Sequence, residues 1–272
     1  GVRLVGSEMC IRDRHCFLKN AVLEFHHRSS ILTLKKGNPM LKKDNFKQNL
    51  KAFFQKYKHA WVLLYVFIYF PWFTYLEKHV TSNFNVIHTA LDDKIPFIEF
   101  FIVPYMLWFG YVAYAVLYFF FKNKEDYYRL CTFLFVGMTV FLVVSSLYPN
   151  GHYLRPHSFE HDNVFTHMVA WLYATDTPTN LFPSIHVYNS LGVHIAICNS
   201  KEFKDRPKLK LASFILMVSI ILATMFLKQH SVFDVVTAFV MAAVMYSFVY
   251  GRNFAFGRSK EKESFEKQLK HI

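Results

Sequence analysis

Long apolar segments separated by short polar stretches are the dominant pattern in this chain. They cover residues 60–76, 98–121, 128–148, 184–199, 210–227 and 233–250. Most of them approach the ~20 residues that a helix needs to cross a hydrocarbon core of ~30 Å. The segment 184–199 is the most polar of the six, and polar side chains at membrane depth usually face the protein interior. The pattern predicts an all-α, polytopic membrane protein with a six-transmembrane-helix bundle.

The loop between the third and fourth predicted spans, residues 149–182, is unusually long. Loops of this length are usually functional or disordered. Within it, apolar side chains recur with helical spacing at Val164, Phe165, Met168, Trp171 and Leu172. This spacing predicts a helix that lies in the membrane interface.

Composition supports a membrane location. Hydrophobic residues make up 53% of the chain and charged residues 18%, whereas about 25% of an average soluble domain is charged. A large soluble helical core is the alternative, but six consecutive apolar runs would be unusual in such a core. The sequence therefore favours a multi-pass integral membrane protein whose partners are membrane lipids.

Basic residues alternate between the loops. From Met40 onward, one set of segments carries 20 lysines and arginines, and the intervening loops carry four. The basic set comprises residues 40–58, 122–130, 201–210 and 252–272. The positive-inside rule then predicts cytoplasmic termini, with the plasma membrane as the expected location. The net charge of +12 lies where anionic lipid would be, so it requires no nucleic acid partner.

The expected domain organisation follows from these patterns. Residues 3–14 resemble a translated sequencing adapter, so 1–39 are expected to be non-native and disordered. A basic amphipathic cytoplasmic lead-in is expected over 40–58. The membrane domain is expected over 59–251, and a basic cytoplasmic tail over 252–272.

A histidine and a carboxylate four residues apart, His230 and Asp234, precede the last apolar run. The spacing predicts that both lie on one face of the helix that starts there. A carboxylate that accepts from one ring nitrogen leaves the other nitrogen free in a fixed tautomer. The pair therefore favours a nucleophile or base over the structural role of most lone membrane histidines.

A second histidine motif begins the fourth apolar run, where residues 183–186 read Pro-Ser-Ile-His. Proline suits a first helical turn, Ser184 is expected to cap it, and the free N–H groups of a helix start attract phosphate oxygens. His186 is placed to protonate a leaving alkoxide. Upstream, Arg155 offers a planar fork for phosphate, and Lys228 adds a second cation. Together the motifs predict phosphoryl transfer through a histidine.

These motifs resemble the type 2 phosphatidic acid phosphatase superfamily, a group of six-helix membrane phosphatases and phosphotransferases, over roughly residues 60–250. The family pattern consists of Lys-x6-Arg-Pro, Pro-Ser-Gly-His and Ser-Arg-x5-His-x3-Asp. The chain retains Arg155-Pro156, Pro183-Ser184, His186, His230 and Asp234. The resemblance implies that His230 becomes phosphohistidine, that Asp234 orients it and that His186 protonates the leaving group. It implies that Arg155 and Ser184 bind phosphate and that neither a metal nor a cofactor takes part.

The chain departs from the family pattern at several positions. Tyr148 stands at the lysine position, Ile185 replaces glycine, and Ala223-Thr224 replaces Ser-Arg. The bulky Ile185 in Pro-Ser-x-His, and Lys-Gln-His-Ser over residues 228–231 before Asp234, are more similar to the inositol phosphorylceramide synthase branch, which passes the phosphoryl group to a lipid or polyol hydroxyl.

The expected function is an integral membrane lipid phosphatase that acts on a lipid phosphate ester at the outer membrane face. Such a phosphotransferase is the alternative. A non-catalytic relative and a transporter with a histidine relay are further alternatives, although a transporter would need its polar residues at the membrane midplane. The loop cluster His157, Glu160, His161 and Asp162 is interpreted as solvated and not as a metal site.

Overall fold

The computed structural model describes residues 48, 51–81 and 83–251, and the chain divides into two compact units with the boundary between Lys58 and His59. In the first unit, residues 51–56 are helical. The expected segments 1–39 and 252–272, and most of the lead-in 40–58, lie outside the described residues. The second unit contains all of the candidate site residues.

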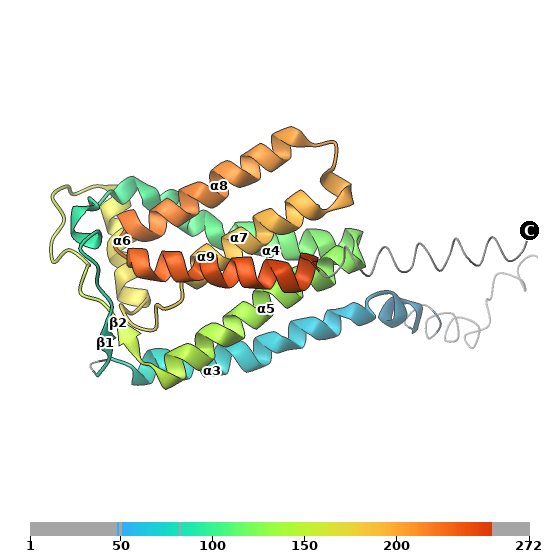
Figure 1. The fold of residues 1–272 in the computed structure, drawn as a ribbon, viewed down its shortest axis with the longest axis horizontal. Coiled ribbons are helices and arrows are strands. Elements are labelled where there is room, and N and C mark those ends of the chain that lie inside the picture. Colours follow the sequence, from blue (N-terminus) through green and yellow to red (C-terminus); the bar gives the residue numbers. More distant parts are fainter. Residues whose placement is uncertain (1–47, 49–50, 82, 252–272) are drawn as a thin grey trace, which may run out of the picture. The chain divides into compact units, whose positions relative to one another are not determined.

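Helices make up most of the second unit (Figure 1). The longer ones are η1 (Lys58–Tyr65), α3 (Val66–His79), α4 (Ile102–Lys122), α5 (Lys124–Leu147), α6 (Val164–Thr175), α7 (Ile185–Asn199), α8 (Pro207–Phe226), α9 (Val232–Tyr246) and η5 (Ser247–Gly251). Short 3-10 turns occur at η2 (Asp92–Lys94), η3 (Glu99–Phe101) and η4 (Lys201–Phe203). The strands β1 (Asn85–Val86) and β2 (Asn150–Gly151) pair in parallel.

Five helical segments in the described part of the chain are long and apolar enough to cross a membrane. They are Lys58–His79, Glu99–Lys122, Lys124–Leu147, Pro207–Phe226 and Val232–Gly251. Five of the six predicted spans are thus confirmed as long apolar helices. The remaining predicted span, 184–199, forms a helix of only 15 residues, α7.

The short helix α7 is the centre of the bundle. It packs against α4, α5, α8 and α9, and most of its residues are buried, including the polar Asn189 and Ser190. Because protein surrounds this helix, its side chains need not be as apolar as those that face lipid. This placement explains why 184–199 has the weakest apolar signal of the six.

Two glycines allow α5 and α7 to approach closely. A Cβ atom at Gly137 would lie 2.0 Å from the Tyr188 ring, and one at Gly192 would lie 2.6 Å from Phe133. The Phe133 and Tyr188 rings stack with centroids 4.8 Å apart, and the Tyr188 hydroxyl donates to the Phe133 carbonyl. Small residues at such crossings let helices pack at short distance, and this packing fixes the position of α7 along α5.

One end of the bundle carries β1, β2 and α6, together with the first turns of α7 and α9 (Figure 1). The buried Asn150 holds this end together, because its Oδ1 accepts from the N–H groups of Leu181 and Phe182. The predicted helix in the long loop is present as α6, capped by Asn163. The loop 149–182 is therefore structured, and it leads into the start of α7.

Candidate active site

His230 lies in the short connection between α8 and α9. The chain turns through Lys228, whose φ of 51° is left-handed, and the N–H groups of Gln229 and His230 then donate to the Thr224 carbonyl. The left-handed region is uncommon for a residue with a Cβ, and strained backbone of this kind clusters at functional sites. The turn delivers His230 to the start of α9.

The carboxylate of Asp234 reaches His230 through a capping box. Ser231 caps α9, and its N–H donates to Asp234 Oδ2 at 3.0 Å. The same Oδ2 lies 3.4 Å from His230 Nδ1. The prediction that both residues share one helical face is wrong in its geometry, because α9 begins only at Val232. The two side chains nevertheless meet, because the cap folds Asp234 back toward the preceding turn.

The two predicted histidines meet across the bundle. His186 lies in the first turn of α7, where Ser184 caps the helix by accepting from the Val187 N–H. His186 Nδ1 lies 3.3 Å from His230 Nε2. The Ser184 N–H donates to the Asp234 carbonyl at 3.3 Å, and this bond ties the start of α7 to the first turn of α9.

Aromatic rings of α4 hold the second histidine. The His186 ring centroid lies 4.3 Å from that of Trp108 and 4.8 Å from that of Tyr105. Both aromatic side chains are buried. This packing limits rotation of the imidazole and keeps its Nδ1 directed at His230.

Arg155 reaches the site from the long loop. Its Nη1 donates to the carbonyls of Asp176 at 2.7 Å and Tyr173 at 3.3 Å. Its Nη2 donates to Gln229 Oε1 at 2.6 Å, and the guanidinium lies over the Tyr173 ring at 4.5 Å. The predicted cation is therefore held rigidly beside the residue that precedes His230.

Lys228 is held elsewhere. Its Nζ donates to the main-chain carbonyls of Asp92 at 2.7 Å and Ile95 at 2.5 Å. Asp92 itself accepts from Ser231 Oγ and from the Val232 N–H at the start of α9. Lys228 and Asp92 thus anchor the loop before α4 to the α8–α9 turn, and the lysine ammonium is already engaged.

Sequence reasoning missed several polar residues around Arg155. Asp176 interacts with Arg155 and with the Tyr105 hydroxyl, and Glu77 accepts from Thr177 at 2.5 Å and from Asn180 at 3.2 Å. Their only sequence signal was a dense polar run, Thr-Asp-Thr-Pro-Thr-Asn over 175–180. In the described site, one guanidinium therefore stands among several carboxylates.

Burial sets the protonation of the site. Burial, followed by the nearby Arg155 guanidinium, lowers the pKa of His230 to about 3. Burial raises the pKa of Asp176 to about 6, although Arg155 opposes this shift. The His230 imidazole is therefore neutral at physiological pH, as a nucleophile requires.

A third histidine, His152, supports the turn between α8 and α9. Its Nδ1 accepts from the Leu154 N–H, so its Nε2 carries the proton and donates to the Gln229 carbonyl at 2.9 Å. Burial lowers the pKa of His152 to about 4, although the bond to Gln229 opposes this shift. The residue is therefore neutral in the folded protein.

This shift predicts a pH-dependent stability difference. Below the unfolded-state pKa of about 6.5, the unfolded chain takes up a proton at His152 that the folded chain does not. We compare the free energy of unfolding of the wild type with that of His152→Asn. As the pH is lowered from 6 to 4.5, we expect the wild-type value to fall relative to the variant by about 1.4 kcal/mol per pH unit. Thermal unfolding in detergent measures this difference. A His157→Asn control, at an exposed position, should show none, and a pH-independent difference for His152→Asn would contradict the assignment.

Within residues 48, 51–81 and 83–251, no three His, Cys, Asp or Glu side chains gather as a metal site would require. Of the loop cluster considered in the sequence, Asp162 pairs with His167, and His161 lies 3.7 Å from Glu99. Their partners thus lie outside the cluster.

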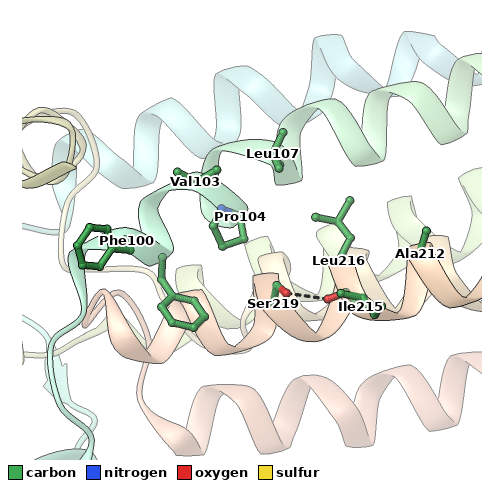
Figure 2. Close-up of a pocket in the computed structure, with 9 residues that line it drawn as sticks. Phe100, Val103, Pro104, Leu107, Ala212, Ile215, Leu216 and Ser219 are labelled. Carbon is green, nitrogen blue, oxygen red and sulfur yellow. Dashed lines mark hydrogen bonds between the residues drawn. The ribbon is translucent and has the colours of Figure 1, made fainter. Parts of the chain in front are cut away.

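An apolar groove of about 520 Å³ lies between α4 and α8. Figure 2 shows Val103, Pro104 and Leu107 of α4 facing Ile215 and Leu216 of α8. Among the described residues, no charged side chain lines it, so the groove suits an alkyl chain and not a phosphate. Its wall α4 is also the helix that carries the two aromatic rings packed on His186.

In comparisons with known proteins, no protein family and no curated protein matches the chain.

Proposed function

We propose that the protein is a membrane enzyme that cleaves a lipid phosphate ester through a phosphohistidine at His230. The observation that carries the proposal is the position of this neutral imidazole, with Nδ1 3.4 Å from Asp234 and Nε2 3.3 Å from His186. A base oriented by a carboxylate, with a second proton carrier within reach, is the arrangement that nucleophilic catalysis requires.

In the first proposed step, His230 Nε2 attacks phosphorus, and the bond from phosphorus to the ester oxygen breaks. His186, in its imidazolium form, donates its Nδ1 proton to the leaving alkoxide and becomes a neutral imidazole. In the second step, water attacks phosphorus and gives a proton to the neutral His186, the P–N bond breaks with its electron pair returning to His230 Nε2, and inorganic phosphate leaves. The 3.3 Å contact between the two imidazoles must widen to admit the phosphoryl group, so it represents the resting state.

The remaining residues supply charge and position. Arg155 offsets the charge of the phosphoryl oxygens, and the Ser184-capped start of α7 directs backbone N–H groups toward them. Lys228 is left out of the phosphate-binding set because its ammonium already donates to two carbonyls. On these grounds we place the chain near the type 2 phosphatidic acid phosphatases.

A phosphotransferase is the second candidate, and the charge of the site favours it. Arg155 interacts with Asp176 and Glu77, and a dianionic monoester would meet repulsion from these carboxyl groups. A phosphodiester carries one negative charge and would need fewer cations. Transfer of its phosphoryl unit to a hydroxyl would use the same two histidines.

One experiment separates these candidates. Purified protein is incubated with lipid phosphomonoesters and phosphodiesters, without added divalent cation, and free phosphate and new lipid species are followed together. Free phosphate from a monoester supports the phosphatase, whereas a new phospholipid formed from a diester and an alcohol supports the phosphotransferase. Formation of neither product overturns both.

We further propose that α7 is a sixth span and that α6 lies in the interface, with the site on the outer face and the termini cytoplasmic. The end of the bundle opposite His186 and His230 carries Lys122, Lys124, Lys201 and Lys204, as the positive-inside rule requires of a cytoplasmic end.

Cysteine labelling tests this orientation. In a cysteine-free background, we expect an impermeant maleimide to label Ser158→Cys in intact cells and Asp205→Cys only after permeabilisation. Both positions are exposed. Gly151, in the same loop as Ser158, is unsuitable for a labelling cysteine, because a Cβ there would lie 2.6 Å from the Pro178 carbonyl oxygen. The reverse labelling pattern would invert the topology.

A further inference from the structure

Gln229 has an unused hydrogen-bond donor inside the site. Its side chain is 1% exposed, and its Oε1 accepts from Arg155 Nη2 at 2.6 Å. Because a guanidinium can only donate, this contact fixes which end of the amide faces the arginine. The Nε2 group at the other end is buried and has no acceptor among the described residues.

Arg155 has a similar unused donor. Its Nη atoms donate to Tyr173, Asp176 and Gln229, but its Nε is buried and has no acceptor in the described part of the chain. An unsatisfied buried donor destabilises the folded state, so two on neighbouring side chains are unusual without a ligand. Gln229 directly precedes His230 in the chain, and Arg155 is hydrogen-bonded to the Gln229 amide.

We propose that the Gln229 amide, together with Arg155 Nε, binds the non-bridging oxygens of the phosphoryl group that His230 attacks. This inference rests on the proposed function and adds a binding residue to it. A phosphoryl group carries several acceptor lone pairs, so one oxyanion can satisfy both donors. A neutral amide donor also suits a site with few cations, since it binds the oxyanion without a further buried charge.

The backbone at Gln229 is held independently of its side chain. Its N–H donates to the Thr224 carbonyl, and its carbonyl accepts from His152 Nε2. Substitutions that change only the side chain therefore leave the His230 turn in place, which makes the position testable.

Gln229→Glu keeps an oxygen for Arg155 Nη2 but replaces the NH2 donor with a second acceptor and adds a negative charge. Gln229→Leu removes both functions at similar volume. We expect Gln229→Leu to lower kcat/KM by about 10- to 100-fold, the range expected for one hydrogen bond to a charged group, and Gln229→Glu to lower it further through repulsion. Gln55→Glu, at an exposed position, is the charge-matched control.

Inhibition by orthovanadate, a phosphate mimic, provides a readout of phosphate binding that is separate from kcat. The inhibition constant should rise in both Gln229 variants, while their unfolding temperatures stay within a few degrees of the wild type. A lower unfolding temperature with unchanged vanadate inhibition would reduce Gln229 to a structural role and overturn the inference. If the wild type neither turns over lipid phosphates nor binds vanadate, the proposed function itself fails. If the wild type is active and the Gln229 variants match it, the inference alone fails.

Discussion

Replacing His230 with alanine should abolish both turnover and the phosphoenzyme on every substrate. The variant removes the only protein atom in the proposed mechanism that bonds to phosphorus, so no activated substrate can compensate. We expect activity to fall to the background of empty membranes. Rapid alkaline quenching of enzyme mixed with labelled substrate measures the phosphohistidine, and product analysis measures turnover.

Two companions sharpen this test. Asp234→Asn keeps an oxygen that can accept from the Ser231 N–H, so the α9 cap survives while the carboxylate beside His230 is lost. In an analogous Ser-His-Asp triad, the same change costs about 10⁴-fold in kcat, and we expect a loss of that order here. His157→Ala, in the exposed part of the loop, should remain fully active. Residual phosphoenzyme in His230→Ala would assign the nucleophile to another residue.

Replacing His186 should have an effect that depends on the leaving group. An alkyl phosphate leaves as a poor, strongly basic alkoxide and needs the proton that His186 supplies, which is worth roughly 10²–10⁴-fold in general acid catalysis. A nitrophenyl phosphate leaves readily without protonation. His186→Ala should therefore lose most of its activity on lipid phosphates and keep part of its activity on the nitrophenyl ester.

The shape of the His186 pocket requires a control. The imidazole packs between Tyr105 and Trp108, so alanine leaves a cavity, and His186→Gln should be measured beside it. Both variants should show the same selective loss if proton transfer is the cause. If His186→Ala and His230→Ala have the same profile on both substrates, the division of roles between the two histidines is wrong.

The local chemistry of the chain was readable from the sequence. The lengths of the apolar runs predicted six spans, because the hydrocarbon thickness sets the length of a span, and five of the six are long apolar helices in the described residues. The spacing of Val164, Met168 and Leu172 predicted α6. The Pro-Ser-x-His motif predicted a capped helix start at Ser184, because capping depends on residues a few positions apart.

Only the tertiary structure decided which of these residues meet. His186 and His230 are 44 residues apart, and their 3.3 Å contact depends on how α7 packs among α4, α5, α8 and α9. That packing also explains why 184–199 is polar and short. Asp234 reaches His230 through a capping box and not along a helical face, a distinction that the i,i+4 spacing alone cannot make.

The sequence also did not reveal which groups accept hydrogen bonds from the two cations. The sequence analysis expected both Arg155 and Lys228 to supply positive charge for the phosphate. In the structure, the Lys228 ammonium binds carbonyls of the 92–95 loop, and the Arg155 guanidinium binds Gln229. Periodicity and motif spacing report short-range order along the chain, so they determined the helices, the caps and the candidate histidines. The orientation of each charge depends on contacts between segments up to about 140 residues apart, and those are fixed only when the helices pack.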